Sequence, residues 1–202
     1  MASFYTYLPL LQQVEGAFQI NRNDPGNYNS EKQLVGTNYG ISARFYEGII
    51  GRPPTEADMR AITKDQAQKI FLDYFWNAQK ADQINSQAMA NTIIDHQVNA
   101  GDGVRLAQRV LNNHFGFNLS TDNKVGPITL NALNSVHPGE FVTIYNQARA
   151  DHYRRIGNAT FLEGWLIRLG KFAVDYQKPI SVFAIVAIAA GGFFLYNQVL
   201  KA

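Results

Sequence analysis

Residues 15–41 read EGAFQINRNDPGNYNSEKQLVGTNYGI and depart most clearly from the helical pattern of the rest of the chain. From residue 19 onward this stretch is rich in Asn, Gly, Asp and Pro, with short apolar pieces between the turn signals. Such a composition favours a loop or a small hairpin over a helix. Because long irregular segments inside compact helical domains are usually functional, we expect this segment to contribute to a site.

On both sides of this segment, apolar residues recur at helical spacing. Thr63 and Gln66 have the spacing of a capping box at the start of a helix. Ser86 is suited to cap a further helix that stops near Gly101, and Pro127 suits a first helical turn. The pattern predicts a mainly α fold with a boundary close to Gly101.

Residues 179–200 contain no charged side chain, and Lys178 and Lys201 bracket them. A helix over residues 180–200 would be about 31 Å long, which matches a hydrocarbon core of about 30 Å. A buried core helix is the alternative, but such helices are seldom apolar on every face over this length. The sequence therefore predicts one C-terminal transmembrane helix, with the lipid bilayer as the partner of residues 180–200.

Charge and cysteine content exclude several classes of function. The chain has 18 basic and 16 acidic residues and no basic tract, so no nucleic-acid partner is predicted. It has no cysteine, which removes disulfides, thiol nucleophiles and cysteine metal sites. We expect no cofactor and no metal site, because the histidines are too dispersed along the chain to suggest one by spacing: His96, His114, His137 and His152.

Glu15 is the first candidate for chemistry. If residues 4–14 form a helix, Glu15 lies at its C-terminal end, where the helix dipole disfavours a carboxylate. Apolar neighbours such as Ala17 and Phe18 act in the same direction, so the sequence predicts a raised pKa for Glu15. A carboxylic acid that stays protonated suits general-acid cleavage of a glycosidic bond. A solvated glutamate at a helix end is the alternative.

Asp24 and Thr37 lie in the polar loop. Two carboxyl groups in contrasting environments, here Glu15 and Asp24, form the acid and base arrangement of glycoside hydrolysis. Thr37 ends the loop and could hydrogen-bond a water beside Asp24. The alternatives are that Asp24 forms the turn of its Asp-Pro-Gly sequence and that Thr37 belongs to a hairpin.

Several motifs in order resemble glycoside hydrolase family 108 muramidases. The pieces EGAF at 15–18, DPG at 24–26 and TNYGI at 37–41 resemble the family's signature. Thr37 follows Asp24 by 13 residues, a longer separation than in the phage-type lysozymes that share the Glu–Asp spacing. The later pieces resemble a helix end of that family and the peptidoglycan-binding domain that follows it: DHQVNAG at 95–101, AQRVL at 107–111, DNKVGPITL at 122–130 and FLEGWLIR at 161–168.

The resemblance implies three parts. A lysozyme-like helical domain with a small loop or hairpin segment is expected at 1–101, and a small helical peptidoglycan-binding module with closing helices at 102–178. The membrane anchor follows at 179–202. The implied reaction is hydrolysis of the β-1,4 bond between N-acetylmuramic acid and N-acetylglucosamine, with peptidoglycan glycan strands as partner.

The resemblance also implies site residues. Glu15 would be the catalytic acid, with Asp24 and Thr37 as further catalytic residues. Apart from the resemblance, Asn38, Tyr39 and Trp76 are candidates to bind the glycan, because the aromatic rings of the latter two can stack on sugars. For Tyr39 and Trp76, a place in the core is the alternative, since aromatic residues at helical spacing are often buried.

The sequence is also compatible with two other functions. A lytic transglycosylase on the same fold needs one glutamate and no catalytic Asp, and a membrane-anchored binder of peptidoglycan needs neither. No secretory signal is predicted at residues 1–5, and the basic residues before the apolar span favour a cytoplasmic location for the preceding part. These features suggest a phage lysis enzyme or a virion component, held in the bacterial inner membrane or a virion membrane and acting on the periplasmic wall. Self-association or contact with virion proteins would fit either setting.

Overall fold

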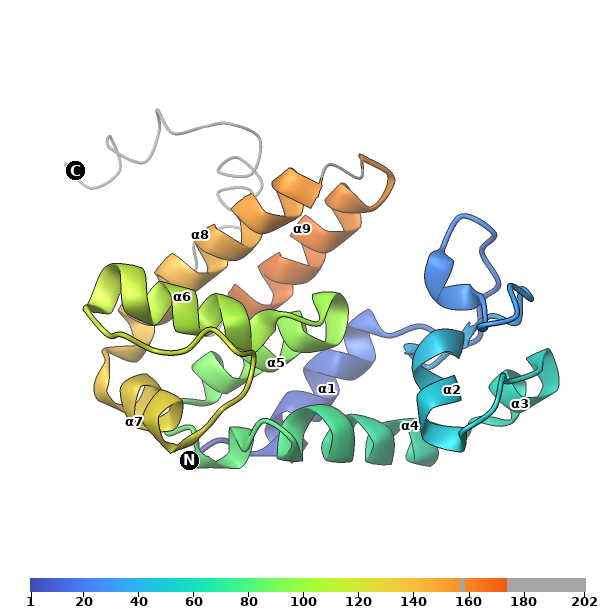
Figure 1. The fold of residues 1–202 in the computed structure, drawn as a ribbon, viewed down its shortest axis with the longest axis horizontal. Coiled ribbons are helices and arrows are strands. Elements are labelled where there is room, and N and C mark those ends of the chain that lie inside the picture. The colour runs from blue at the N-terminus through green and yellow to red at the C-terminus, as the bar shows by residue number, and fades with distance from the viewer. Residues whose placement is uncertain (157–158, 174–202) are drawn as a thin grey trace. The chain divides into compact units, whose positions relative to one another are not determined.

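The computed structural model of the chain describes residues 1–156 and 159–173 (Figure 1). The described residues form two compact units: residues 8–76 form one, and residues 1–7 with 77–156 and 159–173 form the other. Among the described residues, no helix is both long enough and apolar enough to cross a bilayer. The transmembrane helix predicted at 180–200 lies outside the described residues.

The unit of residues 8–76 arranges short elements around the long loop. A hairpin closes this loop: strands β1 (Thr37–Asn38) and β2 (Ile41–Ser42) pair antiparallel, with Thr37 opposite Ser42. The predicted loop or small hairpin is thereby confirmed. The helices and helical turns of the unit are α1 (Phe4–Val14, whose first residues belong to the other unit), η1 (Pro25–Asn27), α2 (Ala43–Ile50), α3 (Glu56–Ala61), α4 (Lys64–Phe71) and η2 (Leu72–Asn77).

Local side-chain caps begin the helices of this unit. Thr63 and Gln66 form the predicted capping box at the start of α4, and Thr55 and Asp58 form another at the start of α3. Ser42, the last residue of the hairpin, caps α2 through its hydroxyl. Each cap satisfies backbone N–H groups that a helix start leaves without partners. The hairpin thus leads into α2 without an intervening loop.

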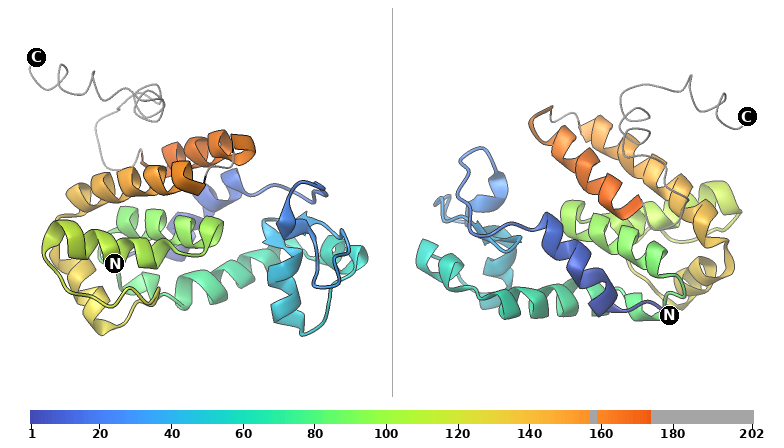
Figure 2. Two further views of the ribbon diagram at one scale, coloured as in Figure 1. Left: turned by 45° about the horizontal axis from the view of Figure 1, so that its top comes forward. Right: turned by 180° about the vertical axis from the view of Figure 1, so that it is seen from behind.

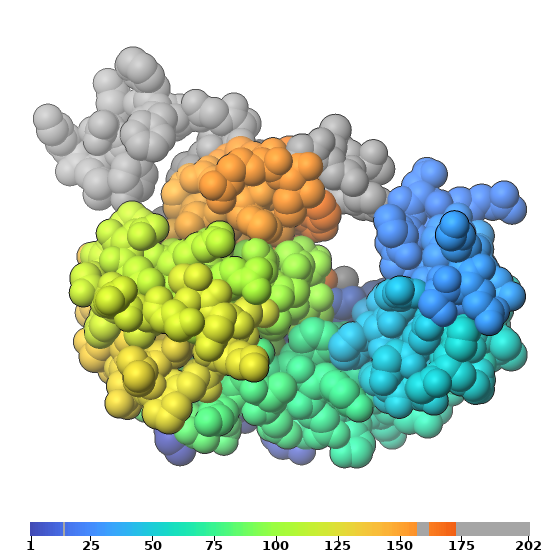
Figure 3. Space-filling model, viewed as in Figure 1, coloured from blue at the N-terminus to red at the C-terminus, as the bar shows by residue number. Residues whose placement is uncertain are grey.

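The second unit is a helical bundle. Its helices are η3 (Ala81–Gln83), α5 (Gln87–Ala100), α6 (Gly103–Phe115), α7 (Pro127–Ser135), α8 (Pro138–Ile156) and α9 (Ala159–Ala173). α5 packs against α6, α8 and α9 (Figure 2), and its residues 88–96 are all buried. α6 and α7 lie side by side on one face of the unit (Figure 3). The mainly α fold predicted from periodicity is confirmed.

The two compact units and the domains predicted from the sequence, 1–101 and 102–178, are different divisions of the chain. The units divide between residues 76 and 77. α5 precedes Gly101 in the sequence but packs on α6 and α8, so it belongs with the later helices. Gly101 still ends α5 in the left-handed conformation, with φ +78°. Gly101 therefore lies between two helices of the bundle, and the domain boundary expected there stays a prediction.

A buried carboxylate joins three helices of the bundle. Asp95 on α5 is 0% exposed and accepts hydrogen bonds from Arg149 on α8 and Arg168 on α9. Arg149 is itself 0% exposed, and its Nε donates to the Tyr153 hydroxyl at 2.8 Å. Buried charges need partners to offset the loss of hydration. Asp95 therefore stabilises the packing of α5 against both later helices.

Candidate active site

Glu15 stands where α1 ends and the loop begins. Its backbone N–H donates to the Leu11 carbonyl at 3.0 Å, so the helical hydrogen bonding continues one residue beyond Val14. The side chain is half-buried. Its carboxyl group lies against the backbone of Gly40, because a Cβ atom built at position 40 would overlap Glu15 Oε2. The carboxyl group is thus positioned from one side by the hairpin.

The turn of that hairpin has the conformation that this approach requires. Tyr39 and Gly40 have φ values of +46° and +77°, and two positive φ values in a two-residue hairpin loop are the mark of a type I′ turn. Glycine adopts this conformation without penalty, whereas a tyrosine at positive φ costs about 1 kcal/mol. Strained residues of this kind concentrate at functional sites.

Glu15 and Tyr39 border the same pocket. It has a volume of about 180 Å³ and lies entirely within the unit of residues 8–76. Its walls come from α1, from residues 15–17, from the hairpin turn and from α4: Leu8, Leu11, Gln12, Glu15, Gly16, Ala17, Tyr39, Lys64, Ala67, Gln68 and Phe71. A fixed carboxyl group at the edge of a mostly apolar pocket can exchange a proton with a ligand that enters it.

Gly40→Ala tests whether the hairpin positions Glu15. The added methyl group would displace the Glu15 carboxyl group, and a misplacement of about 1 Å can reduce catalysis about 100-fold. Gly51→Ala is the matched control, because Gly51 also has a positive φ of +70° but open space around its Cβ position. Both variants should lose similar stability in thermal denaturation, while only Gly40→Ala should lose the activity that depends on Glu15. Equal activity of the two variants would contradict this role of the hairpin.

Asp24 and Thr37 belong to one hydrogen-bonded network in the loop. Asp24 Oδ1 accepts the Gly26 N–H at 2.8 Å, and its Oδ2 accepts from Gln19 Nε2 at 3.3 Å. The Thr37 hydroxyl donates to Asn27 Oδ1 at 2.5 Å. Gln19 and Asn27 exchange two amide hydrogen bonds of 2.9 Å each, so they connect Asp24 to Thr37. The turn role of Asp24 and the hairpin role of Thr37, both expected as alternatives, are present.

The roles of Gln19 and Asn27 in this network cannot be predicted from the sequence. Asn27 is 0% exposed, and its backbone carbonyl also accepts the N–H groups of Val35 and Gly36. It therefore holds the two ends of the loop together. An asparagine and a glutamine eight residues apart give no recognisable signal in a sequence, since the hydrogen bonds between them form only when the loop closes.

Two residues predicted to bind substrate, Asn38 and Trp76, have buried side chains. Trp76 is 1% exposed, so its indole belongs to the core and is not available to stack on a sugar. Asn38 is 4% exposed, and its amide donates to the carbonyls of Met59 and Ile62 at 3.0 and 3.2 Å. These bonds tie β1 to the end of α3. Burial of both side chains disfavours contact with a glycan, and the core position expected as the alternative for Trp76 is present.

Comparisons with known proteins give a consistent result. Residues 8–101 match the family described as Glycosyl hydrolase 108, and residues 102–170 match the family described as Predicted Peptidoglycan domain. Among solved structures, the chain is similar to the "Structure of Brucella abortus SagA", with a TM-score of 0.74 and 22% sequence identity. The similarity covers 88% of this chain and 97% of that one, and it shows a shared fold. No curated protein matches the chain.

Proposed function

Because residues 8–101 match glycosyl hydrolase 108 and residues 102–170 match a peptidoglycan domain, we propose that the chain hydrolyses the glycan strands of peptidoglycan. The bond cleaved is the β-1,4 linkage between N-acetylmuramic acid and N-acetylglucosamine. One observation carries the assignment of the acid: Glu15 lines the pocket, and its carboxyl group lies against the backbone of Gly40. The peptidoglycan domain supports binding of the same polymer by the rest of the chain.

In this mechanism Glu15 donates a proton to the glycosidic oxygen as the bond breaks and the sugar gains positive charge. Asp24 orients or activates the water that attacks from the opposite face. This direct attack inverts the anomeric centre and requires the two carboxyl groups to lie about 6.5–9.5 Å apart with substrate bound. At about 5–5.5 Å, Asp24 itself attacks the anomeric carbon, and water, whose proton Glu15 takes, then hydrolyses the glycosyl ester with retention. Thr37 donates its proton to Asn27, so its oxygen lone pairs are free to accept a hydrogen bond from that water.

A lytic transglycosylase is the second candidate. It needs no catalytic aspartate, and both carboxylate oxygens of Asp24 already accept hydrogen bonds within the loop, one at the start of η1 and one from Gln19. In that reaction the 6-hydroxyl group of the muramic acid attacks its own anomeric carbon in place of water. Glu15 would first donate a proton to the leaving oxygen and then accept the proton of the attacking hydroxyl group.

The test of the activity is digestion of purified sacculi by the full chain. A glycosidase lowers the turbidity of the suspension and releases new reducing sugar groups in proportion. Release of free amino groups without reducing sugars would indicate cleavage of the peptide part and contradict the proposal. Binding without any loss of turbidity would contradict it too, and would favour a peptidoglycan-binding protein.

We propose further that residues 180–200 anchor the chain in a membrane, on the strength of their composition. Replacing both Ile185 and Ile188 by Asp should prevent insertion, because each charge near the centre of a span costs about 2.5–3.5 kcal/mol. A control with Ser181 and Gln198 replaced by Asp adds the same charge near the ends of the segment. In flotation with phospholipid vesicles, the natural chain and the control should float and the central variant should not. Equal flotation of both variants would contradict a spanning segment.

Such an anchor would place a wall-degrading enzyme at a bacterial inner membrane or in a virion membrane. Phage lysis or entry is the setting that fits this combination. Recovery of the chain with purified virions would favour the virion component, and recovery only with membranes of lysing cells would favour the lysis enzyme.

A further inference from the structure

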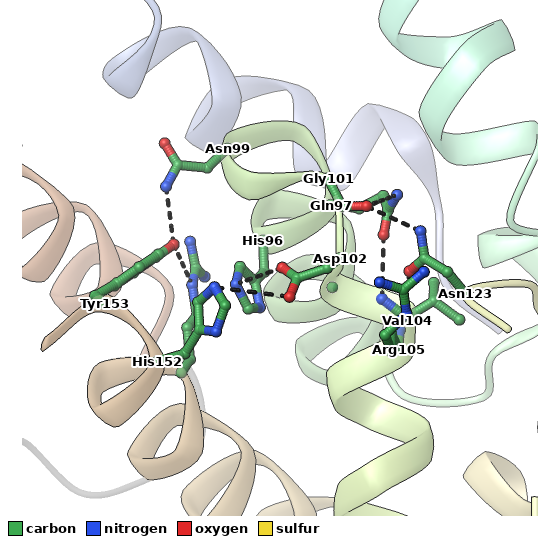
Figure 4. A network of polar contacts seen from close by, with 12 residues as sticks. His96, Gln97, Asn99, Gly101, Asp102, Val104, Arg105, Asn123, His152 and Tyr153 are labelled. Atoms are coloured by element: carbon green, nitrogen blue, oxygen red, sulfur yellow. Dashed lines mark hydrogen bonds and ion pairs between the residues drawn. The ribbon is translucent and has the colours of Figure 1, made fainter. Parts of the chain in front are cut away.

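Three side chains meet where α5, α6 and α8 pack together (Figure 4). His96 lies on α5, Asp102 immediately precedes α6, and His152 lies on α8. His96 Nε2 is 3.4 Å from Asp102 Oδ1, and His152 Nε2 is 3.6 Å from Asp102 Oδ2. One ligand atom from each of the three residues lies within 4.8 Å of the other two. All three residues belong to the helical bundle, far from Glu15 in the sequence.

The hydrogen bonds of Tyr145 determine which nitrogen of His96 carries the proton. The Tyr145 hydroxyl donates its one proton to the Gly103 carbonyl at 3.0 Å. It must therefore accept the bond of 2.9 Å that joins it to His96 Nδ1, so Nδ1 is the protonated nitrogen. His96 Nε2 is then left with a lone pair directed toward Asp102.

This places two acceptors opposite each other in a buried position. His96 is 0% exposed, and neither its Nε2 nor Asp102 Oδ1 has a hydrogen-bond partner within the described part of the chain. A buried acceptor without a donor is costly, so a cation between these atoms would be strongly favoured.

The spacing of the three residues suits a tetrahedral ion. Ligand nitrogen and oxygen atoms at 2.0–2.2 Å from Zn²⁺ stand about 3.3–3.6 Å apart in a tetrahedron. His96 Nε2 stands at such a distance from Asp102 Oδ1, and His152 Nε2 from Asp102 Oδ2, so each carboxylate oxygen faces one histidine nitrogen. Asp102 is the residue before α6, yet its carboxylate makes no capping bond to the helix, unlike the caps of α2 to α5. Its oxygens are therefore available as ligands.

We propose that His96, Asp102 and His152 form a binding site for a divalent transition-metal ion of the zinc type. A water completes the coordination, and it can enter because the side chains of Asp102 and His152 are 23% and 24% exposed. Tyr145 orients His96 by accepting its Nδ1–H, which is the usual arrangement for a histidine ligand. The opposing charge of Arg149 is offset by its pair with Asp95. The ion joins three helices and stabilises the bundle.

The test is calorimetric titration of the metal-free full chain, in mild detergent, with ZnCl₂. We expect one Zn²⁺ per chain, and binding at least about 100-fold weaker in His152→Gln and in Asp102→Asn. Both residues are partly exposed, so both variants should fold, which circular dichroism will verify. His114→Gln, an exposed histidine at the end of α6, is the control and should bind like the natural chain.

Two further measurements separate this site from weak surface binding. Co²⁺ at the site should give the intense visible absorption of tetrahedral coordination, and MgCl₂ should neither bind nor raise the melting temperature. If the metal-free chain takes up no Zn²⁺, or if only His114→Gln weakens the binding, the proposal is wrong. It is equally overturned if His152→Gln and Asp102→Asn bind Zn²⁺ as tightly as the natural chain.

Discussion

Replacing Glu15 by Gln is expected to lower the rate of peptidoglycan hydrolysis about 10³-fold, within the range that a general acid contributes. The amide has the shape of the carboxyl group and keeps the contact with the Gly40 backbone, but it cannot donate a proton to a leaving sugar oxygen. The free energy of unfolding should change by no more than about 0.5 kcal/mol, as for other substitutions outside the core. Initial rates on purified sacculi and urea denaturation measure the two quantities.

Glu31→Gln is the matched control for this variant. Glu31 is an exposed glutamate of the same loop, so its substitution removes the same charge without touching the pocket. Its rate should stay within about twofold of the natural chain, since surface substitutions have small effects. If Glu15→Gln retains a rate close to that of Glu31→Gln, then Glu15 is not the acid, and its place beside the pocket has another meaning.

Asp95→Asn is expected to destabilise the helical bundle by about 3–5 kcal/mol, the cost of breaking a buried ion pair by removing one partner. Asp95 and Arg149 are both 0% exposed, so the guanidinium would lose its counter-charge without gaining water. The amide keeps one acceptor oxygen, so it can accept from Arg149 or from Arg168 but not from both, as the carboxylate does. The expected result is a large shift of the urea midpoint with an unchanged slope.

The exposed pair of Asp151 and Arg154 provides the comparison. Their side chains are 51% and 30% exposed, so Asp151→Asn should cost less than about 1 kcal/mol. Each of the two variants removes the negative charge of one aspartate that forms an ion pair with an arginine of the bundle. Equal destabilisation by the two would show that burial of Asp95 adds nothing, and would contradict the account of how α5 is held.

The local features of the fold could be predicted from the sequence because they depend on neighbouring residues. The capping box of Thr63 and Gln66, the cap at Ser86 and the helix start at Pro127 all form where expected. Each involves backbone groups within one helical turn, so a short stretch of sequence contains both partners. The loop and hairpin at 19–41 could be predicted for the same reason, because their Gly, Pro, Asn and Asp residues restrict the backbone angles at their own positions.

Features that depend on packing between distant segments could not be predicted. The approach of Gly40 to Glu15 requires the hairpin to fold back on the end of α1. The burial of Trp76 depends on other segments that pack over its side chain. His96 and His152 are 56 residues apart, and their spacing suggested no metal site, yet α5 and α8 bring them together. Periodicity shows which face of a helix is apolar, but not which helix covers it.

The masses of the reaction products test most directly whether the chain hydrolyses the glycan strand with Glu15 as the general acid. Sacculi are digested with the full chain and with Glu15→Gln, and the soluble muropeptides are measured by mass spectrometry. We expect products that end in a hydrated, reducing N-acetylmuramic acid, present with the natural chain and absent with the variant. Products that end in a 1,6-anhydro ring, lighter by one water, would contradict hydrolysis and establish a transglycosylase. Reducing ends on N-acetylglucosamine would contradict the bond assigned.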